Sequence, residues 1–287
     1  MRKKHAKKPA QQVQYLPLLR SALDMTGSLS TCYRRFHNYS FGNQLLLWSQ
    51  FASRGQQPCP VATFKRWQEL GRQVKKGSKA MCMIVPSLCK REVEEKDGTV
   101  TVVTFPIFFL RNYWFPVSDT EGETEVEEKL ETPVFSLSRI LENLGIQRID
   151  YTMINGNCQG YCERSTGNIA INPLAVHPDK TALHEIAHSL LHCGKDADAS
   201  EDIHDEAGFR ECEAESTALI VGSVMGILSE RERSDSVGYI KTWMARVAGL
   251  DVDKLIEKSA KRIFGAVDRI LKANSQVPGE DAGAVMA

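Results

Sequence analysis

The apolar positions of the first 110 residues predict helices followed by a small antiparallel sheet. Three stretches repeat apolar residues at the three- and four-residue spacing of an amphipathic helix. These stretches cover residues 12–26, 42–53 and 61–71. Residues 80–86 and 99–110 are instead rich in β-branched and aromatic residues, and Asp97 with Gly98 provides a turn between them. The pattern predicts an α+β unit.

The second half of the chain shows mainly helical periodicity, with a small sheet near its start. A helix is expected over 134–144, where Gly145 ends it, and strands are expected over 148–153 and 168–172. A turn-rich hairpin, NGNCQGYCERSTG, lies between the two strands. Four further helices are expected over 178–193, 205–227, 235–249 and 251–273. This order predicts a mainly helical α+β domain.

An acidic segment separates the two halves. Residues 117–132, VSDTEGETEVEEKLET, carry seven acids and one lysine without apolar periodicity, which is typical of a solvated linker. We therefore expect domains over 1–116 and 133–275, with a loose tail over 276–287. A charged, exposed helix over 117–132 would leave the boundary in the same place.

Charge is distributed unevenly along the 287 residues, although the formal net charge is zero. Residues 1–91 hold 17 Lys and Arg against two acids, whereas the remainder holds 19 basic and 34 acidic residues. Such asymmetry suggests two units with different partners, the basic one facing a polyanion. A solvated basic surface without a partner is the alternative.

The composition favours a cytoplasmic protein. No apolar stretch approaches the roughly 18 residues of a membrane span, and the basic N-terminus MRKKHAKKPAQQ is not followed by the apolar region of a secretory signal. The eight cysteines are scattered, which is typical of reduced thiols. Cys158 and Cys162 have no second pair nearby, so we expect no zinc knuckle there.

His184, Glu185 and His188 form the pattern H-E-x-x-H within KTALHEIAHSLLHC. Side chains four residues apart on a helix differ by about 40° in direction and about 6 Å in rise, so both imidazoles can reach one cation. Glu185 points about 100° away from His184 and is placed to act on water as a general base. The alternative is a histidine pair that faces solvent or is satisfied in the core.

A third ligand must come from elsewhere, because His192 lies about 12 Å along the same helix from His184. We expect His192 at the surface or behind the ligands. Catalytic zinc usually has three protein ligands and one open position. The helix over 205–227 offers Glu211, Glu213 and Glu215 as carboxylate ligands. Glu213 is preferred because it shares a face with the residues that follow it, and Glu211 is the second choice.

The motifs of the second half resemble those of zincin-like metallopeptidases of the ImmA/IrrE type. HEIAH is followed after about 25 residues by ECEAESTALIVGSVMG, and SVGYIKTWM at 236–244 matches a tyrosine and tryptophan helix of the antirestriction protein ArdC group. The resemblance implies a gluzincin-type domain in which Glu213 is the third zinc ligand. The C-Q-G-Y-C hairpin has no counterpart in the family pattern.

The first half is similar to the N-terminal single-stranded-DNA-binding domain of the same group. The matching stretches are YSFGNQLLLWSQ (39–50), VATFKRWQELGRQVKKGSKAMCMIVP (61–86) and FPVSDTEGE (115–123). Phosphate attraction needs cations and base stacking needs aromatic rings, and both interleave here. The expected DNA-binding residues are Arg34, Arg35, Tyr39, Lys65, Arg66, Trp67, Arg72, Lys75, Lys76 and Lys79. Trp67 and Tyr39 could equally belong to the core.

Two functions of different class follow. One is a Zn²⁺-dependent metallopeptidase, with Glu185 as general base and an unknown protein or peptide as substrate, joined to a sequence-tolerant single-stranded-DNA-binding domain. The other is a non-catalytic, DNA-binding antirestriction protein whose zinc domain is structural or vestigial. A fourth protein ligand, such as Cys193, would favour the second. The resemblance implies that the protein is encoded on a mobile element.

Overall fold

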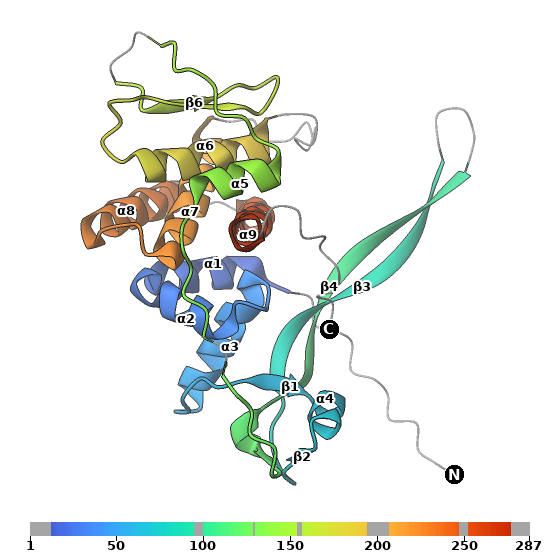
Figure 1. Ribbon diagram of the computed structural model, residues 1–287. Coiled ribbons are helices and arrows are strands. Elements are labelled where there is room, and N and C mark those ends of the chain that lie inside the picture. Colours follow the sequence, from blue (N-terminus) through green and yellow to red (C-terminus); the bar gives the residue numbers. More distant parts are fainter. Residues whose placement is uncertain are drawn as a thin grey trace. The chain divides into compact units, whose positions relative to one another are not determined.

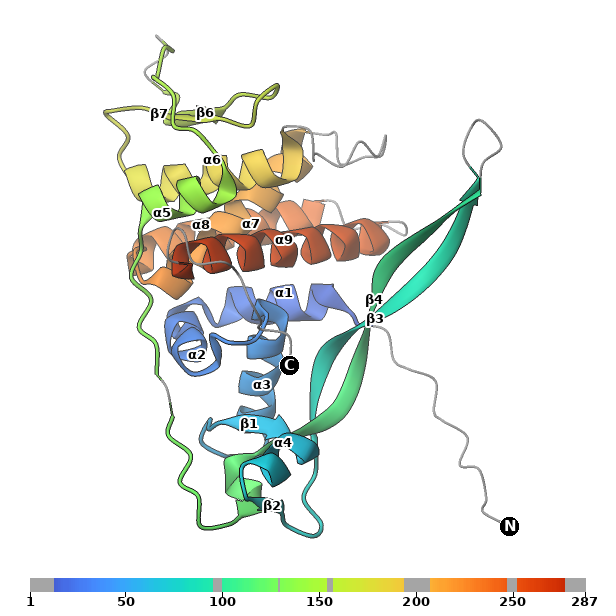
Figure 2. The ribbon, with the colours of Figure 1, turned by 45° about the vertical axis from the view of Figure 1, so that its right-hand side comes forward.

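The computed structural model describes residues 13–94, 100–128, 130–153, 157–193, 207–246 and 252–276. The chain divides into two compact units (Figures 1 and 2). Unit 1 contains Met1–Gln14 and Leu45–Lys129, and unit 2 contains Tyr15–Gln44 and Leu130–Ala287. Helices and antiparallel strands occur in both, which confirms the α+β class. Within the described ranges, no helix combines the length and apolar character needed to cross a membrane.

Unit 1 is built around a three-stranded antiparallel sheet. Its elements are most of α3 (Phe41–Ser53), β1 (Val61–Thr63), α4 (Phe64–Glu69), β2 (Gln73–Val74), β3 (Met81–Glu94), β4 (Val100–Pro116), η2 (Val117–Asp119) and β5 (Thr120–Glu121). The strand order is β1-β4-β3, and β2 pairs separately with β5. The indole N–H of Trp67 donates to the carbonyl of Phe115 at 2.9 Å and so ties α4 to β4.

Strands β3 and β4 form a long two-stranded ribbon. Their register runs from Met81 opposite Trp114, across a bulge after Met81, to Glu94 opposite Val100. Both strands are longer than the sequence predicted: β3 continues through SLCKREVE to Glu94, and β4 continues through RNYWFP to Pro116. That turn, at residues 97 and 98, lies outside the described residues.

Unit 2 is mainly helical and carries a two-stranded hairpin. Its elements are α1 (Tyr15–Asp24), η1 (Thr26–Ser28), α2 (Leu29–Phe36), the start of α3, α5 (Leu137–Leu144), β6 (Gly160–Cys162), β7 (Ile169–Ile171), α6 (Pro178–His192), α7 (Ala207–Met225), α8 (Glu230–Arg246) and α9 (Val252–Ser275). The hairpin of β6 and β7 packs on α6, and α6 packs in turn on α7 (Figure 1). Helix α7 also contacts α8 and α9. Helix α6 thus lies between the β6–β7 hairpin and a helical layer.

Carboxylates of α9 hold the N-terminal helices in unit 2. Glu257 accepts hydrogen bonds from the backbone N–H groups of Tyr15 and Leu16 at the start of α1. Asp268 accepts from the backbone N–H of Phe41, at the start of α3, at 2.6 Å. The first N–H groups of a helix have no partner within the helix, so these acids cap α1 and α3.

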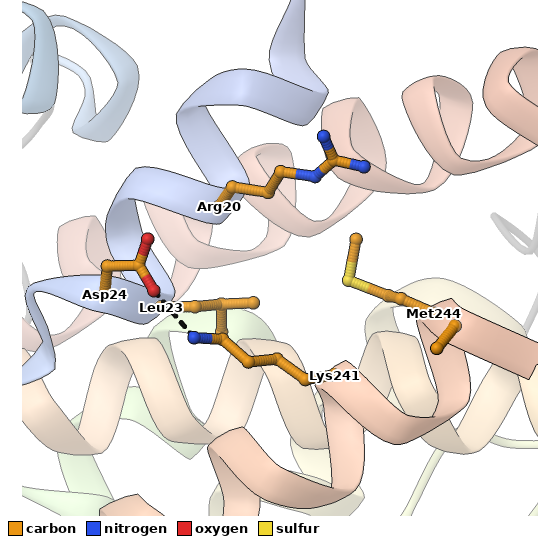
Figure 3. Close-up of a pocket in the computed structure, with 6 residues that line it drawn as sticks. Arg20, Leu23, Asp24, Lys241 and Met244 are labelled. Atoms are coloured by element: carbon orange, nitrogen blue, oxygen red, sulfur yellow. Dashed lines mark hydrogen bonds and ion pairs between the residues drawn. The ribbon is translucent and has the colours of Figure 1, made fainter. Parts of the chain in front are cut away.

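Helix α1 also contacts α8. Lys241 Nζ lies 2.7 Å from Asp24 Oδ1 (Figure 3), beside a cavity of about 380 Å³. Arg20 and Met244 line the same cavity from the two helices. Both partners of the ion pair are more than half exposed, so the pair is screened by water and contributes little stability.

Several predicted elements differ from the structure. Residues 61–63 are a strand rather than the start of a helix, because Thr63 caps α4 by accepting from Arg66 N–H at 3.3 Å. Residues 148–153 form no strand; only Arg148 makes an isolated bridge, to Ile169. The predicted helices over 134–144 and 178–193 are present as α5 and α6, and Gly145 ends α5 in the left-handed conformation.

The compact units differ from the predicted domains at one place. Tyr15–Gln44 belongs to unit 2, whereas the sequence placed it in the first domain. Its helices pack on α7 and α9, which are distant in sequence. The start of the acidic segment belongs to unit 1, because β5 at Thr120–Glu121 pairs with β2. The chain therefore crosses between the units after residues 14, 44 and 129, and the predicted linker over 117–132 contains only the last of these crossings.

Candidate metal centre

Helix α6 supplies two histidines to one side of unit 2. It begins at Pro178, whose fixed φ suits the first turn, and Asp179 lies favourably near the positive end of the helix dipole. Leu183, Ile186 and Ala187 are fully buried and anchor the helix. The imidazoles of residues 184 and 188 lie on a different, partly exposed face.

The Nε2 atoms of His184 and His188 converge. They lie 3.1 Å apart, and both approach Glu211 of α7, at 3.2 Å from His184 and 3.4 Å from His188. Two ligands of a tetrahedral Zn²⁺ with bonds of about 2.0–2.1 Å are separated by about 3.3–3.4 Å. The donor atoms of these three residues therefore have a chemistry and a spacing that could hold a divalent metal ion.

The carboxylate that joins the two imidazoles is that of Glu211, the second choice from the sequence, and not that of Glu213. Residues two apart on a helix point about 200° apart, so Glu211 and Glu213 cannot face the same point. Glu213 is 1% exposed, and its Oε2 lies 2.8 Å from His192 Nε2 and 3.7 Å from the Arg262 guanidinium. The preferred placement of Glu213 beside the imidazole pair is therefore corrected.

Glu215, which was among the three candidate acids but was not chosen as a ligand, also contacts the cluster. Its Oε2 lies 3.2 Å from Nδ1 of His184, while Lys180 and Ser236 contact its Oε1 at 2.9 Å and 2.5 Å. Burial opposes its charge, but these hydrogen bonds lower the pKa of Glu215 to about 2. The signal was available, because Glu215 follows Glu211 by four residues and so shares its face of α7.

The cluster favours a positive charge at its centre. Although burial disfavours the imidazolium, hydrogen bonds with Glu211 and Glu215 raise the pKa of His184 to about 9. Hydrogen bonds from His184 and His188 depress the pKa of Glu211 well below its ordinary value. Carboxylates that draw a proton onto an imidazole at this point would equally attract a divalent cation.

Glu185 adjoins the cluster in a cavity of about 630 Å³. It is 7% exposed, and burial raises the pKa of its carboxyl, opposed by the nearby His184 and His188. Gly160 of β6 lines the same cavity. A Cβ on Gly160 would lie 3.2 Å from Cγ of Glu185, so the strand backbone passes close to the Glu185 side chain.

The cysteines lie beside the cluster without joining it. Cys193, considered above as a fourth ligand, shares a hydrogen bond with Cys162 of β6, and this bond lowers the pKa of Cys193. Cys158 lines the cavity and contacts the Gly160 carbonyl at 3.1 Å. Among the described residues, the candidate metal-ligating group contains two histidines and one glutamate and no cysteine.

The expected DNA-binding residues of unit 1 fall into two groups. Trp67 is 1% exposed and belongs to the core, so the stacking role considered for it is corrected. Arg72 is held by the carbonyls of Gly122 and Thr124 and by Thr120, which is a structural arrangement. The remaining cations have exposed side chains: Lys65, Arg66, Lys75, Lys76 and Lys79.

Three expected DNA-binding residues belong to unit 2 instead. Arg34 is exposed and Arg35 half-buried, and both lie in the last turn of α2. Tyr39 follows α2, and burial raises the pKa of its phenol. A surface formed by all ten expected residues would have to include both units.

Comparisons with known proteins match the first half of the chain. Residues 19–139 match the family described as ArdcN, the N-terminal domain of anti-restriction factor ArdC, and this range contains residues of both compact units. No curated protein matched. The chain is also similar to the antirestriction ArdC protein from the R388 plasmid in a metal-free crystal structure, with 18% identity and a TM-score of 0.48 over 90% of this chain and 98% of that one. The Mn(II)-bound structure of the same protein gives 17% identity and a TM-score of 0.46 over the same shares.

Proposed function

The chain is ArdC-like over residues 19–139, and from that premise we propose that it is a zinc-dependent peptidase joined to a sequence-tolerant single-stranded-DNA-binding domain. From the same resemblance we infer an antirestriction role for a protein carried on a mobile element. One observation carries the peptidase assignment: His184, His188 and Glu211 have the spacing of a ligand set beside the buried Glu185.

The two Nε2 atoms and a carboxylate oxygen of Glu211 would hold the ion. Two histidines and one glutamate are a donor set that catalytic zinc uses, and it leaves one position for water. A bound zinc ion would lower the pKa of that water and polarise a peptide carbonyl. The arrangement favours the enzyme over a structural zinc domain, because Cys193 is engaged with Cys162 rather than with the cluster.

Glu185 would serve as general base and then as general acid. A carboxylate whose pKa is raised by burial accepts a proton from water more readily and later passes it to the leaving amine. An extended peptide would bind along β6, whose backbone lies next to Glu185 at Gly160. It would add a strand to the hairpin, a common way of binding an unfolded segment.

The test of this function is hydrolysis of a quenched-fluorescent peptide library with Zn²⁺ or Mn²⁺ present. We expect the wild type to cleave, and Glu185→Gln to lose cleavage while retaining bound metal. Glu211→Ala should lose the metal. If Glu185→Gln cleaved at the wild-type rate, the assigned mechanism would be wrong.

The exposed cations of unit 1 support the DNA-binding part. Lys75, Lys76 and Lys79 lie between β2 and the start of β3, while Lys65 and Arg66 are already near Glu69. We expect the affinity for an oligonucleotide to fall steeply with salt, and the slope to lessen by about one for each lysine removed from this group. A salt-independent affinity would contradict DNA binding through phosphates.

A further inference from the structure

We propose that His192 and Glu213 form a positioning chain that fixes the ring of His188 and strengthens its hold on a divalent cation. The proposal rests on the metal site proposed above and assigns a role to two residues outside it. Both are buried, and their partners come from three helices, α6, α7 and α9.

The chain of contacts is continuous. Nδ1 of His188 lies 3.0 Å from Nδ1 of His192, and Nε2 of His192 lies 2.8 Å from Oε2 of Glu213. The guanidinium of Arg262 lies 3.7 Å from the same Oε2 and donates to the carbonyl of Leu191, within α6. Two hydrogen bonds thereby link His188 to the carboxylate of Glu213, which faces the guanidinium of Arg262.

Only one arrangement of protons satisfies these contacts once Nε2 of His188 is a ligand. A neutral imidazole that ligates through Nε2 carries its hydrogen on Nδ1, so His188 is the donor to His192. His192 accepts at Nδ1 and must carry its own hydrogen on Nε2, which it donates to Glu213. The carboxylate thus selects the tautomer of His192, and His192 selects that of His188.

Burial makes this arrangement rigid. The side chains of His192 and Glu213 are 5% and 2% exposed, so water does not compete for their hydrogen bonds. A buried carboxylate without a partner is costly, and Glu213 therefore restricts His192 to the geometry that serves it. Partners of this kind orient a ligand ring and raise its basicity.

His192 cannot instead be a ligand of the same ion. Both of its ring nitrogens are engaged, one by His188 and one by Glu213. The equivalent partner of His184 is Glu215, at 3.2 Å from Nδ1. Nδ1 of His184 thus contacts a carboxylate directly, whereas Nδ1 of His188 is linked to one through a second histidine.

The test measures Zn²⁺ and Mn²⁺ affinity of the full chain by chelator competition, without any substrate. His192→Phe and Glu213→Leu remove an acceptor and should weaken affinity about 10- to 100-fold. His192→Asn places an acceptor near the former Nδ1, and Glu213→Gln retains an acceptor for His192. Both variants should therefore bind the metal more tightly than the apolar variants do, with most of the wild-type affinity. Ile140→Ala, a fully buried site on α5, is the control for a general loss of stability.

The visible spectrum of the Co²⁺-loaded protein reports ligand geometry independently. We expect His192→Phe to change it and Ile140→Ala to leave it unchanged. Wild-type affinity and spectrum in both His192→Phe and Glu213→Leu would overturn the positioning chain alone. Absence of metal binding by the wild type would overturn the proposed function together with it.

Discussion

Asp268 is a buried acid whose ionisation opposes folding. It lies on α9 and accepts a hydrogen bond from Phe41 N–H, but burial outweighs this bond and raises the pKa of Asp268 from 3.8 to about 6. A raised pKa means that the folded protein binds the proton more tightly than the unfolded chain does. Its contribution to stability is therefore complete below about pH 4 and is lost as the pH rises through about 6.

We predict that Asp268→Asn stabilises the protein at about pH 8 and much less at about pH 4.5, since asparagine can still accept from Phe41. The two-unit shift in pKa corresponds to a difference on the order of 3 kcal/mol. Thermal unfolding of both proteins at the two pH values measures it. An equal change in the midpoint at both pH values would contradict the assignment to Asp268 ionisation.

At the scale of single residues, the sequence predicted site residues whose relation is set within one helix. It did not predict those whose relation depends on how two helices pack. His184, Glu185 and His188 follow from helical spacing alone. Choosing Glu211 over Glu213 requires the rotation of α7 relative to α6, which no pattern in either helix contains. Trp67 was ambiguous for the same reason, because an aromatic ring among cations suits a core and a stacking surface equally.

At the scale of elements, β6 lies unusually close to the helix that carries the cluster. A Cβ on Gly160 would lie 2.8 Å from Cγ2 of Thr181, 3.0 Å from the Ala170 carbonyl oxygen and 3.2 Å from Cγ of Glu185. The first of these distances is shorter than real Cβ atoms show and the other two are tight, so a side chain at 160 would require its neighbours to shift. The close approach places the strand edge beside the proposed general base.

We predict that Gly160→Ala lowers the thermal midpoint and weakens metal binding by displacing β6 from α6. Thr181→Ser removes the nearest methyl group, so the double variant should recover part of the loss. Gly238→Ala is the control, because nothing lies within 4 Å of its added Cβ, and it should be neutral or slightly stabilising in α8. Equal effects of the Gly160 and Gly238 substitutions would show that the close approach is unimportant.

Helices with a clear apolar periodicity could be predicted from the sequence. Strands, which depend on hydrogen bonds to a neighbouring strand, could not be predicted as well. Helices α6, α7 and α9 are long and patterned, and the sequence located them to within a few residues. Residues 148–153 alternate like a strand, yet they meet β7 only at the Arg148–Ile169 bridge. Strand identity requires hydrogen bonds to a neighbour, which local alternation does not supply.

At the scale of the whole molecule, the N-terminal helices complete the unit that carries the candidate metal centre. Leu19, Leu29 and Phe36 are at most 2% exposed, and α1 and α2 pack on α9 and α7. Sequence order suggested otherwise, because 15–44 contains the expected DNA-binding residues Arg34, Arg35 and Tyr39 and overlaps the matching stretch at 39–50. Contacts between segments more than 200 residues apart are set by tertiary packing and leave no local signature.

A fragment beginning at residue 133 should therefore fail to fold, although it contains the entire predicted peptidase domain. Without 15–44, the faces of α7 and α9 lose their apolar cover, at a cost of about 1.5–3 kcal/mol for each large buried side chain removed. Glu257 also loses its partners at the start of α1, and Asp268 loses Phe41. Thermal unfolding and Zn²⁺ affinity of the fragment measure the effect.

The matched control joins residues 13–44 to 130–287 through a short Gly/Ser linker and omits 45–129. Glu131 N–H donates to the Arg34 carbonyl at 3.1 Å, and His37 contacts the Glu131 carboxylate at 3.1 Å, so the two segments already meet near the junction. This chain should unfold cooperatively and bind Zn²⁺ as the full protein does. If the fragment from residue 133 matched it in both measurements, α1 and α2 would be dispensable. The metal centre would then belong to the C-terminal segment alone.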